Sequence, residues 1–189
     1  MLTNSMNRYG CISIGLHWIM ALMIFILFGL GVYMVDLDYY DPWYHRGPHW
    51  HESIGVCLMV LLIFRFLWRL TNPLPQLNGQ AWEKRLAIWV HRSHYFLMFL
   101  IVITGYLIPT AEGQGIKVFD WFTLPSLNPL FGIEKYNNDM VGNIHWAGAW
   151  SLIILVALHA AAALKHHFVD HDTTLTRMLI CTPQKEKQP

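Results

Sequence analysis

The segment from Asn143 to Phe168 constrains the fold of this chain most, because it is apolar enough to cross a bilayer and yet contains two histidines. His145 and His159 are 14 residues apart, so on a helix their side chains point within about 40° of one another. The same spacing separates them by about 21 Å along the helix axis, which is most of a hydrocarbon core about 30 Å thick. Ionisable side chains inside a membrane helix are costly and indicate a functional site.

Four apolar runs of 20 residues or more indicate a polytopic membrane protein. Charged residues make up only 13% of the chain, about half of the usual share in soluble domains. We therefore predict an all-α membrane protein, a four-transmembrane-helix bundle that forms a single integral-membrane domain over residues 1–189. The predicted helices span about 12–35, 51–70, 88–109 and 143–168. The first run lacks a small-residue cleavage site, so we interpret it as a retained helix.

The distribution of charge predicts the orientation of the bundle. With an even number of helices, both termini and the loop between the second and third helices share one side, which carries ten basic and four acidic residues. The opposite side carries three basic and eight acidic residues. The positive-inside rule then predicts cytoplasmic termini. Arg65 and Arg69 close the second helix, where long side chains can reach the headgroups.

This orientation assigns a depth to each histidine. His51 and His145 fall at the periplasmic end, and His17 and His159 fall toward the cytoplasm. Each pair comes from two different helices, and cofactor sites in four-helix bundles are built from facing side chains. Two imidazoles from opposite sides suit the axial ligation of haem iron, whereas zinc or copper needs three or four converging ligands. We predict two haem sites, with the pairs His51/His145 and His17/His159 as iron ligands.

Small residues follow each of these histidines by about one turn: Ala21, Gly55, Gly148, Ala149, Ala162 and Ala163. Residues three or four apart share a helix face, so these positions would let a flat porphyrin approach the backbone. Small residues also serve helix–helix packing, and the sequence leaves both interpretations open.

The other histidines have competing interpretations. His49 is the main rival ligand on the second helix. His91 and His94 lack the small neighbour, and they are expected to bond haem propionates or a quinone headgroup, or only to anchor the third helix. The histidines that flank helices are expected to be solvated: His45, His49, His166, His167 and His171.

Cysteine and net charge exclude other classes of protein. Cys11, Cys57 and Cys181 are isolated, without a C-x-x-C or C-x-x-C-H motif, which argues against a disulfide framework, a zinc ribbon and covalently attached haem. The net charge of +1 and the lack of a basic, aromatic-interleaved patch argue against nucleic acid as a partner.

The motifs around the histidines resemble the bacterial cytochrome b561 family, diheme four-helix proteins related to the cytochrome b subunits of nickel–iron hydrogenase and formate dehydrogenase. The matching segments are LHW at 16–18, HESIG at 51–55, IHWAGAW at 144–150 and LHAAAALKHHF at 158–168. The resemblance extends from Arg8 to Leu179 and includes the 14-residue spacing. It implies two non-covalent haem b groups held by the four histidines. The eukaryotic ascorbate-dependent namesakes have six helices, and this chain does not fit them.

Bis-histidine haem leaves no open iron position, so we expect outer-sphere one-electron transfer. The resemblance implies oxidation of periplasmic superoxide and reduction of ubiquinone, that is, a superoxide:quinone oxidoreductase. Only Arg46, Lys117 and Lys135 stand on the periplasmic side against eight acids, which is a weak field for steering an anion. The cytoplasmic residues that are expected to hold propionates, protonate a quinone or anchor helix ends are Arg92, His94, Lys165, His166 and His167.

Other functions remain open at this point. The chain could be the membrane-anchor subunit of a larger respiratory oxidoreductase, a histidine-bearing metal transporter, or a haem-carrying structural subunit. The expected partners are the lipid bilayer, quinone, and a periplasmic donor that is a protein or a small molecule. The expected location is the bacterial inner membrane, with several membrane passes.

Overall fold

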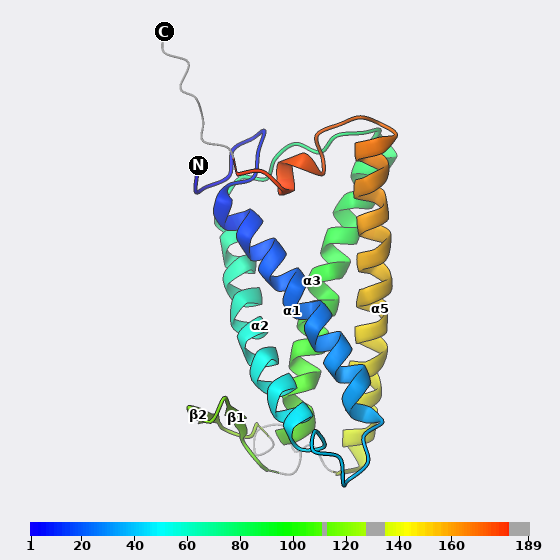
Figure 1. Ribbon diagram of the computed structural model, residues 1–189. Coiled ribbons are helices and arrows are strands. Elements are labelled where there is room, and N and C mark those ends of the chain that lie inside the picture. The colour runs from blue at the N-terminus through cyan, green and yellow to red at the C-terminus, as the bar shows by residue number, and fades with distance from the viewer. Residues whose placement is uncertain (111–112, 128–134, 182–189) are drawn as a thin grey trace.

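Four long helices dominate the computed structural model, which describes residues 1–110, 113–127 and 135–181, with the backbone alone for 135–138. The helices are α1 (Cys11–Val35), α2 (Arg46–Thr71), α3 (Ala81–Thr110) and α5 (Lys135–Phe168). They lie side by side in one bundle (Figure 1). Each is long and apolar enough to cross a membrane. The predicted four-transmembrane-helix bundle is confirmed.

Three of the helices begin earlier than the apolar runs predict. The second begins at Arg46, because Pro48 lies in the first turn, where a missing N–H breaks no helical hydrogen bond. The third begins at Ala81, since the segment AWEKRLA continues the same helix instead of forming a separate interfacial one. The fourth begins at Lys135. Polar first turns therefore extend the helices beyond the apolar stretches.

A short hairpin covers the start of α2. Strands β1 (Ile116–Val118) and β2 (Phe122–Leu124) pair antiparallel within a segment that the sequence predicted to be a loop. The hydroxyl of Ser53, fully buried, accepts the Phe119 N–H at 3.0 Å and donates to the Lys117 carbonyl at 3.3 Å. We call this end of the bundle the hairpin end, and the opposite end, where the N-terminus and Cys181 lie, the terminal end (Figure 1).

An apolar belt fills the middle of the bundle. Its buried side chains are Met20, Leu27, Leu58, Leu62, Met98 and Leu152. Leu152 is seven residues, or about two helical turns, from both His145 and His159. The belt therefore separates two histidine levels. Most other large apolar side chains are exposed on the outside, as a bundle that faces lipid requires.

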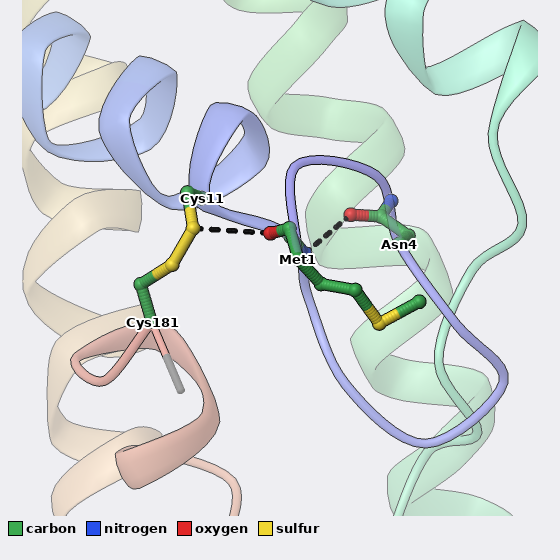
Figure 2. Close-up of a disulfide and its surroundings, with 5 residues drawn as sticks. Met1, Asn4, Cys11 and Cys181 are labelled. Carbon is green, nitrogen blue, oxygen red and sulfur yellow. Dashed lines mark hydrogen bonds between the residues drawn. A yellow bond between two sulfur atoms is a disulfide. The ribbon is translucent and has the colours of Figure 1, made fainter. Parts of the chain in front are cut away.

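The segment that follows α5, up to Cys181, packs across the terminal end. Cys181 forms a disulfide with Cys11 at the start of α1, beside the N-terminal loop (Figure 2). The indole N–H of Trp18 donates to the Met178 carbonyl at 2.7 Å, and Arg177 donates to the Gln76 carbonyl at 3.0 Å. A cross-link of this kind contributes about 2–4 kcal/mol by restricting the unfolded chain. The sequence carries no signal for this disulfide, because two isolated cysteines 170 residues apart form no motif.

Cys181 allows a test of orientation. In a Cys11→Ser/Cys57→Ser variant it is the one remaining thiol, and it is exposed at the terminal end. Because charge predicts that this end is cytoplasmic, we expect a membrane-impermeant maleimide to label Cys181 only after spheroplasts are lysed. As a control, Trp121→Cys in a cysteine-free background places a thiol on the exposed hairpin and should be labelled in intact spheroplasts. The reverse pattern would invert the topology.

Candidate functional site

The first histidine pair lies at the hairpin end, where His51 of α2 meets His145 of α5 with ring centroids 6.2 Å apart. Nδ1 of His145 lies 3.0 Å from the Ile101 carbonyl and 3.2 Å from the Thr104 hydroxyl. The Thr104 hydroxyl donates its own hydrogen to the Leu100 carbonyl at 2.7 Å, so it can only accept from the imidazole. Nδ1 therefore carries the hydrogen, and Nε2 keeps a free lone pair for a ligand.

Two glycines let these imidazoles lie against neighbouring helices. A Cβ at Gly105 of α3 would be 2.9 Å from Cε1 of His145, and a Cβ at Gly31 of α1 would be 3.2 Å from Cε1 of His51. Real Cβ atoms do not approach as closely as 2.9 Å, and 3.2 Å is tighter than most contacts. The sequence analysis missed both glycines, because they lie on helices other than those of the histidines they contact.

The second pair lies at the terminal end, where His17 of α1 and His159 of α5 have ring centroids 6.3 Å apart. His91 and His94 of α3 join them, with centroids 5.5 and 5.3 Å from the His159 ring. His94 bonds the Val90 carbonyl through Nδ1 at 2.8 Å, and its buried Nε2 has no partner in the described part of the chain. This end therefore gathers four imidazoles, against two at the hairpin end.

Arg65 and Arg69 lie next to the second pair. Arg65 donates to Nδ1 of His17 at 3.2 Å and to the Tyr95 hydroxyl at 3.3 Å. The guanidinium of Arg69 lies 5.5 Å from the centre of the Tyr95 ring. Arg65 thus turns into the bundle, whereas the sequence analysis expected it to reach the headgroups.

The rival histidines are engaged elsewhere. Nε2 of His49 lies 3.6 Å from a carboxylate oxygen of Asp120 in the hairpin turn, while His51 holds the position opposite His145. His45 packs edge-on against Tyr44, as an interface residue is expected to do.

His166 differs from the solvated residue that the sequence predicted. It is half-buried, with Nδ1 3.0 Å from an oxygen of Asp170 and 2.9 Å from one of Asp172. Burial by itself would raise the pKa of Asp172, but hydrogen bonds from Thr174 and the neighbouring imidazole outweigh burial and lower this pKa. Of the other basic residues predicted to reach a cofactor, Lys165 pairs with Glu83 and Asp170, and Arg92 stacks on Trp89.

The two pairs have the separation that haem iron requires. Two imidazoles that bind one iron atom from opposite sides, each nitrogen about 2 Å from the metal, have centroids about 6.3 Å apart. The pairs measure 6.2 and 6.3 Å, and the contacts of His91 and His94 with His159 are shorter. The backbones of α1 and α2 do not pack closely on α5, so each pair bridges helices that stand apart.

The small residues near the histidines divide into two kinds. A Cβ at Gly55 would meet no atom within 4 Å, so this position leaves room beside His51. A Cβ at Gly148 would lie 3.2 Å from Ile101, so this glycine serves the packing of α3 on α5. The packing interpretation therefore holds at Gly148, and the approach of a porphyrin at Gly55 stays a prediction.

A compact metal site does not form at either pair. Among the described residues, one group of three or more potential ligands has its atoms within 4.8 Å of one another, and it comprises Glu83, His166 and Asp170. The ammonium of Lys165 already lies 2.8 and 2.7 Å from the two carboxylates. Each histidine pair thus offers two facing imidazoles, fewer than the three or four converging ligands of a zinc or copper centre.

Comparison with known proteins agrees with this geometry. The family profile described as prokaryotic cytochrome b561 matches residues 8–180. The chain is 45% identical to cytochrome b561 homolog 2 of Escherichia coli K12 over 94% of each chain. It is 28% identical to the probable superoxide oxidase CybB of Yersinia pestis, over 92% of this chain and 96% of the relative. It is also 26% identical to cytochrome b561 homolog 1 of Escherichia coli K12, over 92% and 98%.

These matches confirm the resemblance that the histidine motifs indicated. The family implies haem b, and the four apolar helices place the chain in a membrane. The chain therefore belongs to the prokaryotic cytochrome b561 family and is a multi-pass bacterial membrane cytochrome b of electron transport.

Proposed function

We propose that this protein passes single electrons across the membrane through two haem b groups. His51 and His145 would hold one haem, and His17 and His159 the other. The observation that supports this assignment best is the separation of 6.2 and 6.3 Å between the paired imidazoles, since haem iron with two axial histidines requires about 6.3 Å. When bound, haem b supplies reversible one-electron chemistry at an iron with no open coordination position.

The protein's own groups would orient the ligands and exclude water. The bond from Nδ1 of His145 to Ile101 fixes the ring and makes Nε2 more basic toward a metal. Gly31 and Gly105 leave room for the two rings to lie close to the backbones of α1 and α3 at the hairpin end. The apolar belt around Leu152 fills the space between the two levels, so water is kept out of the electron path.

We propose an electron path from the periplasm toward the cytoplasmic leaflet, because charge predicts that the hairpin end is periplasmic. Superoxide as donor and ubiquinone as acceptor are supported by the relative named as a probable superoxide oxidase. Lys117 adds a specific feature. Its side chain is exposed on β1, and its carbonyl bonds Ser53, two residues after His51. A cation therefore stands beside the proposed entry site for an anion.

Single histidine substitutions test the ligand assignment. We expect His51→Ala or His145→Ala to reduce the haem content from two per chain to one, because each removes an axial ligand of the same haem. His17→Ala or His159→Ala should remove the other haem. Haem extracted per chain and the absorption spectrum of the reduced protein measure the result. His49→Ala is the matched control and should keep both haems. If His49→Ala lost a haem and His51→Ala kept both, the assignment of His51 as a ligand would be rejected.

Glycine substitutions test whether the close approach of the α3 backbone positions the His145 imidazole. We expect Gly105→Ala to displace His145, since the new Cβ would lie 2.9 Å from Cε1, and so to weaken haem binding at the hairpin end. Gly29→Ala on α1 is the control, because a Cβ there meets no atom within 4 Å. Haem retention during purification distinguishes them. Equal retention in the two variants would mean that the close contact does not position the ligand.

The donor and acceptor can be tested with the purified protein and a ubiquinone analogue. We expect a steady source of superoxide to reduce the haems faster than superoxide disproportionates. Lys117→Ala should lower this rate and its dependence on ionic strength, whereas Lys117→Arg should preserve both, because charge and not shape steers a small anion. Two haems without reduction by superoxide would favour the alternative that the protein is the membrane-anchor subunit of a larger oxidoreductase.

A further inference from the structure

We propose that Arg65 is the anchor of a carboxylate of the cofactor at the terminal end, and that it releases His17 when the cofactor binds. This inference rests on the proposed haem site of His17 and His159. It concerns the residues around that site and not the ligands themselves. Three observations support it, namely an unpaired cation, a hydrogen-bond direction and the position of Arg65 between helices.

The first observation is a pair of guanidinium groups without a counter-anion. Arg65 and Arg69 are four residues apart on α2, so they share one helix face, and both contact Tyr95. Neither forms an ion pair with a carboxylate in the described part of the chain. Charge within a membrane bundle is costly unless it is paired. The two cations therefore need an anion that the described chain does not supply.

The carboxylates of the terminal end are already occupied. Glu83 pairs with Lys165 at 2.8 Å, and Asp170 pairs with the same ammonium at 2.7 Å. Asp172 bonds the imidazole of His166 at 2.9 Å. None of them is free to turn toward Arg65. Because no described carboxylate at this end is free, we infer that the anion comes from a bound molecule.

The second observation is the direction of the bond between Arg65 and His17. A guanidinium has only donors, so Nδ1 of His17 must accept at 3.2 Å, and the hydrogen of this neutral ring is on Nε2. His145 at the other end has the opposite arrangement, with the hydrogen on Nδ1 and Nε2 free. His17 can offer Nε2 to a metal only after the hydrogen moves to Nδ1. Nδ1 then donates and can no longer accept from Arg65.

Binding of the cofactor therefore exchanges one partner of Arg65 for another. The hydrogen of His17 moves from Nε2 to Nδ1, no charge or electron is gained or lost, and the donors of Arg65 become free. A planar guanidinium fork matches a carboxylate and binds it with two parallel hydrogen bonds. The two propionate groups of haem b are carboxylates of the cofactor that the family implies. Arg69 stands one turn further toward the end of α2 and can serve the second carboxylate.

The third observation is the position of Arg65 between helices, which favours a cofactor carboxylate over a lipid phosphate. Arg65 is half-buried and contacts α1 through His17 and α3 through Tyr95. It thus points between helices and not outward to the bilayer surface. A lipid headgroup carries the same kind of anionic oxygen, so the experiment must distinguish the two sources.

A haem with esterified propionates is the direct probe, because the dimethyl ester keeps the ring and iron but loses both charges. His51→Ala provides a background in which only the terminal-end haem should remain. In this background we expect free haem to bind about 10- to 100-fold more tightly than its dimethyl ester, as for charge-assisted hydrogen bonds in a partly buried site. Equal affinities for the two haems would overturn the proposal, without any substitution at Arg65.

Substitutions then assign the preference to Arg65. Arg65→Met should remove most of the preference for free haem, and Arg65→Lys should keep part of it, because lysine preserves the charge but not the fork. Arg85→Met is the matched control, since Arg85 is an exposed arginine at the same end that bonds only its own helix, and it should leave the preference unchanged. A preference that survives in Arg65→Met would overturn the assignment.

Two further outcomes separate the alternatives. If the ester binds as well as free haem, and Arg65→Met loses haem only in vesicles of anionic lipid, the partner of Arg65 is a lipid phosphate and the proposal is wrong. If the unsubstituted protein contains no haem at all, the proposed function fails. If it contains two haems and the variants differ from it in neither occupancy nor preference, only the inference about Arg65 fails.

Discussion

The cost of placing an imidazole inside a bilayer governs the rest of this structure. A histidine that is shielded from water must find partners for its polar nitrogens or lose several kcal/mol. At the hairpin end, His145 places one nitrogen against the backbone of α3 and presents the other toward His51. The four histidines face one another in pairs across helices that otherwise stand apart, and Nδ1 of His51 is buried without a hydrogen-bond partner in the described part of the chain.

The side chains that surround the histidine pair differ between the two ends of the bundle. At the hairpin end no guanidinium contacts the paired rings in the described part of the chain. His145 bonds the Ile101 carbonyl, and the two rings lie close to Gly31 and Gly105. The terminal end is polar, with two additional imidazoles and two guanidiniums around its pair. An electron or an anion is therefore stabilised to different extents at the two levels. This asymmetry, together with the apolar belt between them, makes the two ends of the bundle electrostatically different.

The sequence predicted the parts of this arrangement that depend on one helix at a time. Apolar length gave the four helices, and the 14-residue spacing of His145 and His159 placed them on one stripe, because both follow from the pitch of an isolated helix. Charge in the loops gave the relative depth of His17 and His51. Contacts between helices were not predictable. Gly31 and Gly105 carry no local signal, and the inward turn of Arg65 depends on Tyr95 of another helix. The three-residue strands are too short for a recognisable alternation.

Helix α5 carries one histidine of each pair, and this limits how the distance between the two pairs can change. Both of its histidines lie on one uninterrupted helix, so their separation is a fixed number of helical rises and does not depend on any loop. Adding a single residue between them would rotate one histidine by about 100° away from its partner. Steps of about one helical turn, or about 5.4 Å, restore the common face. The interval between the two sites can therefore change only in whole helical turns and not by single residues.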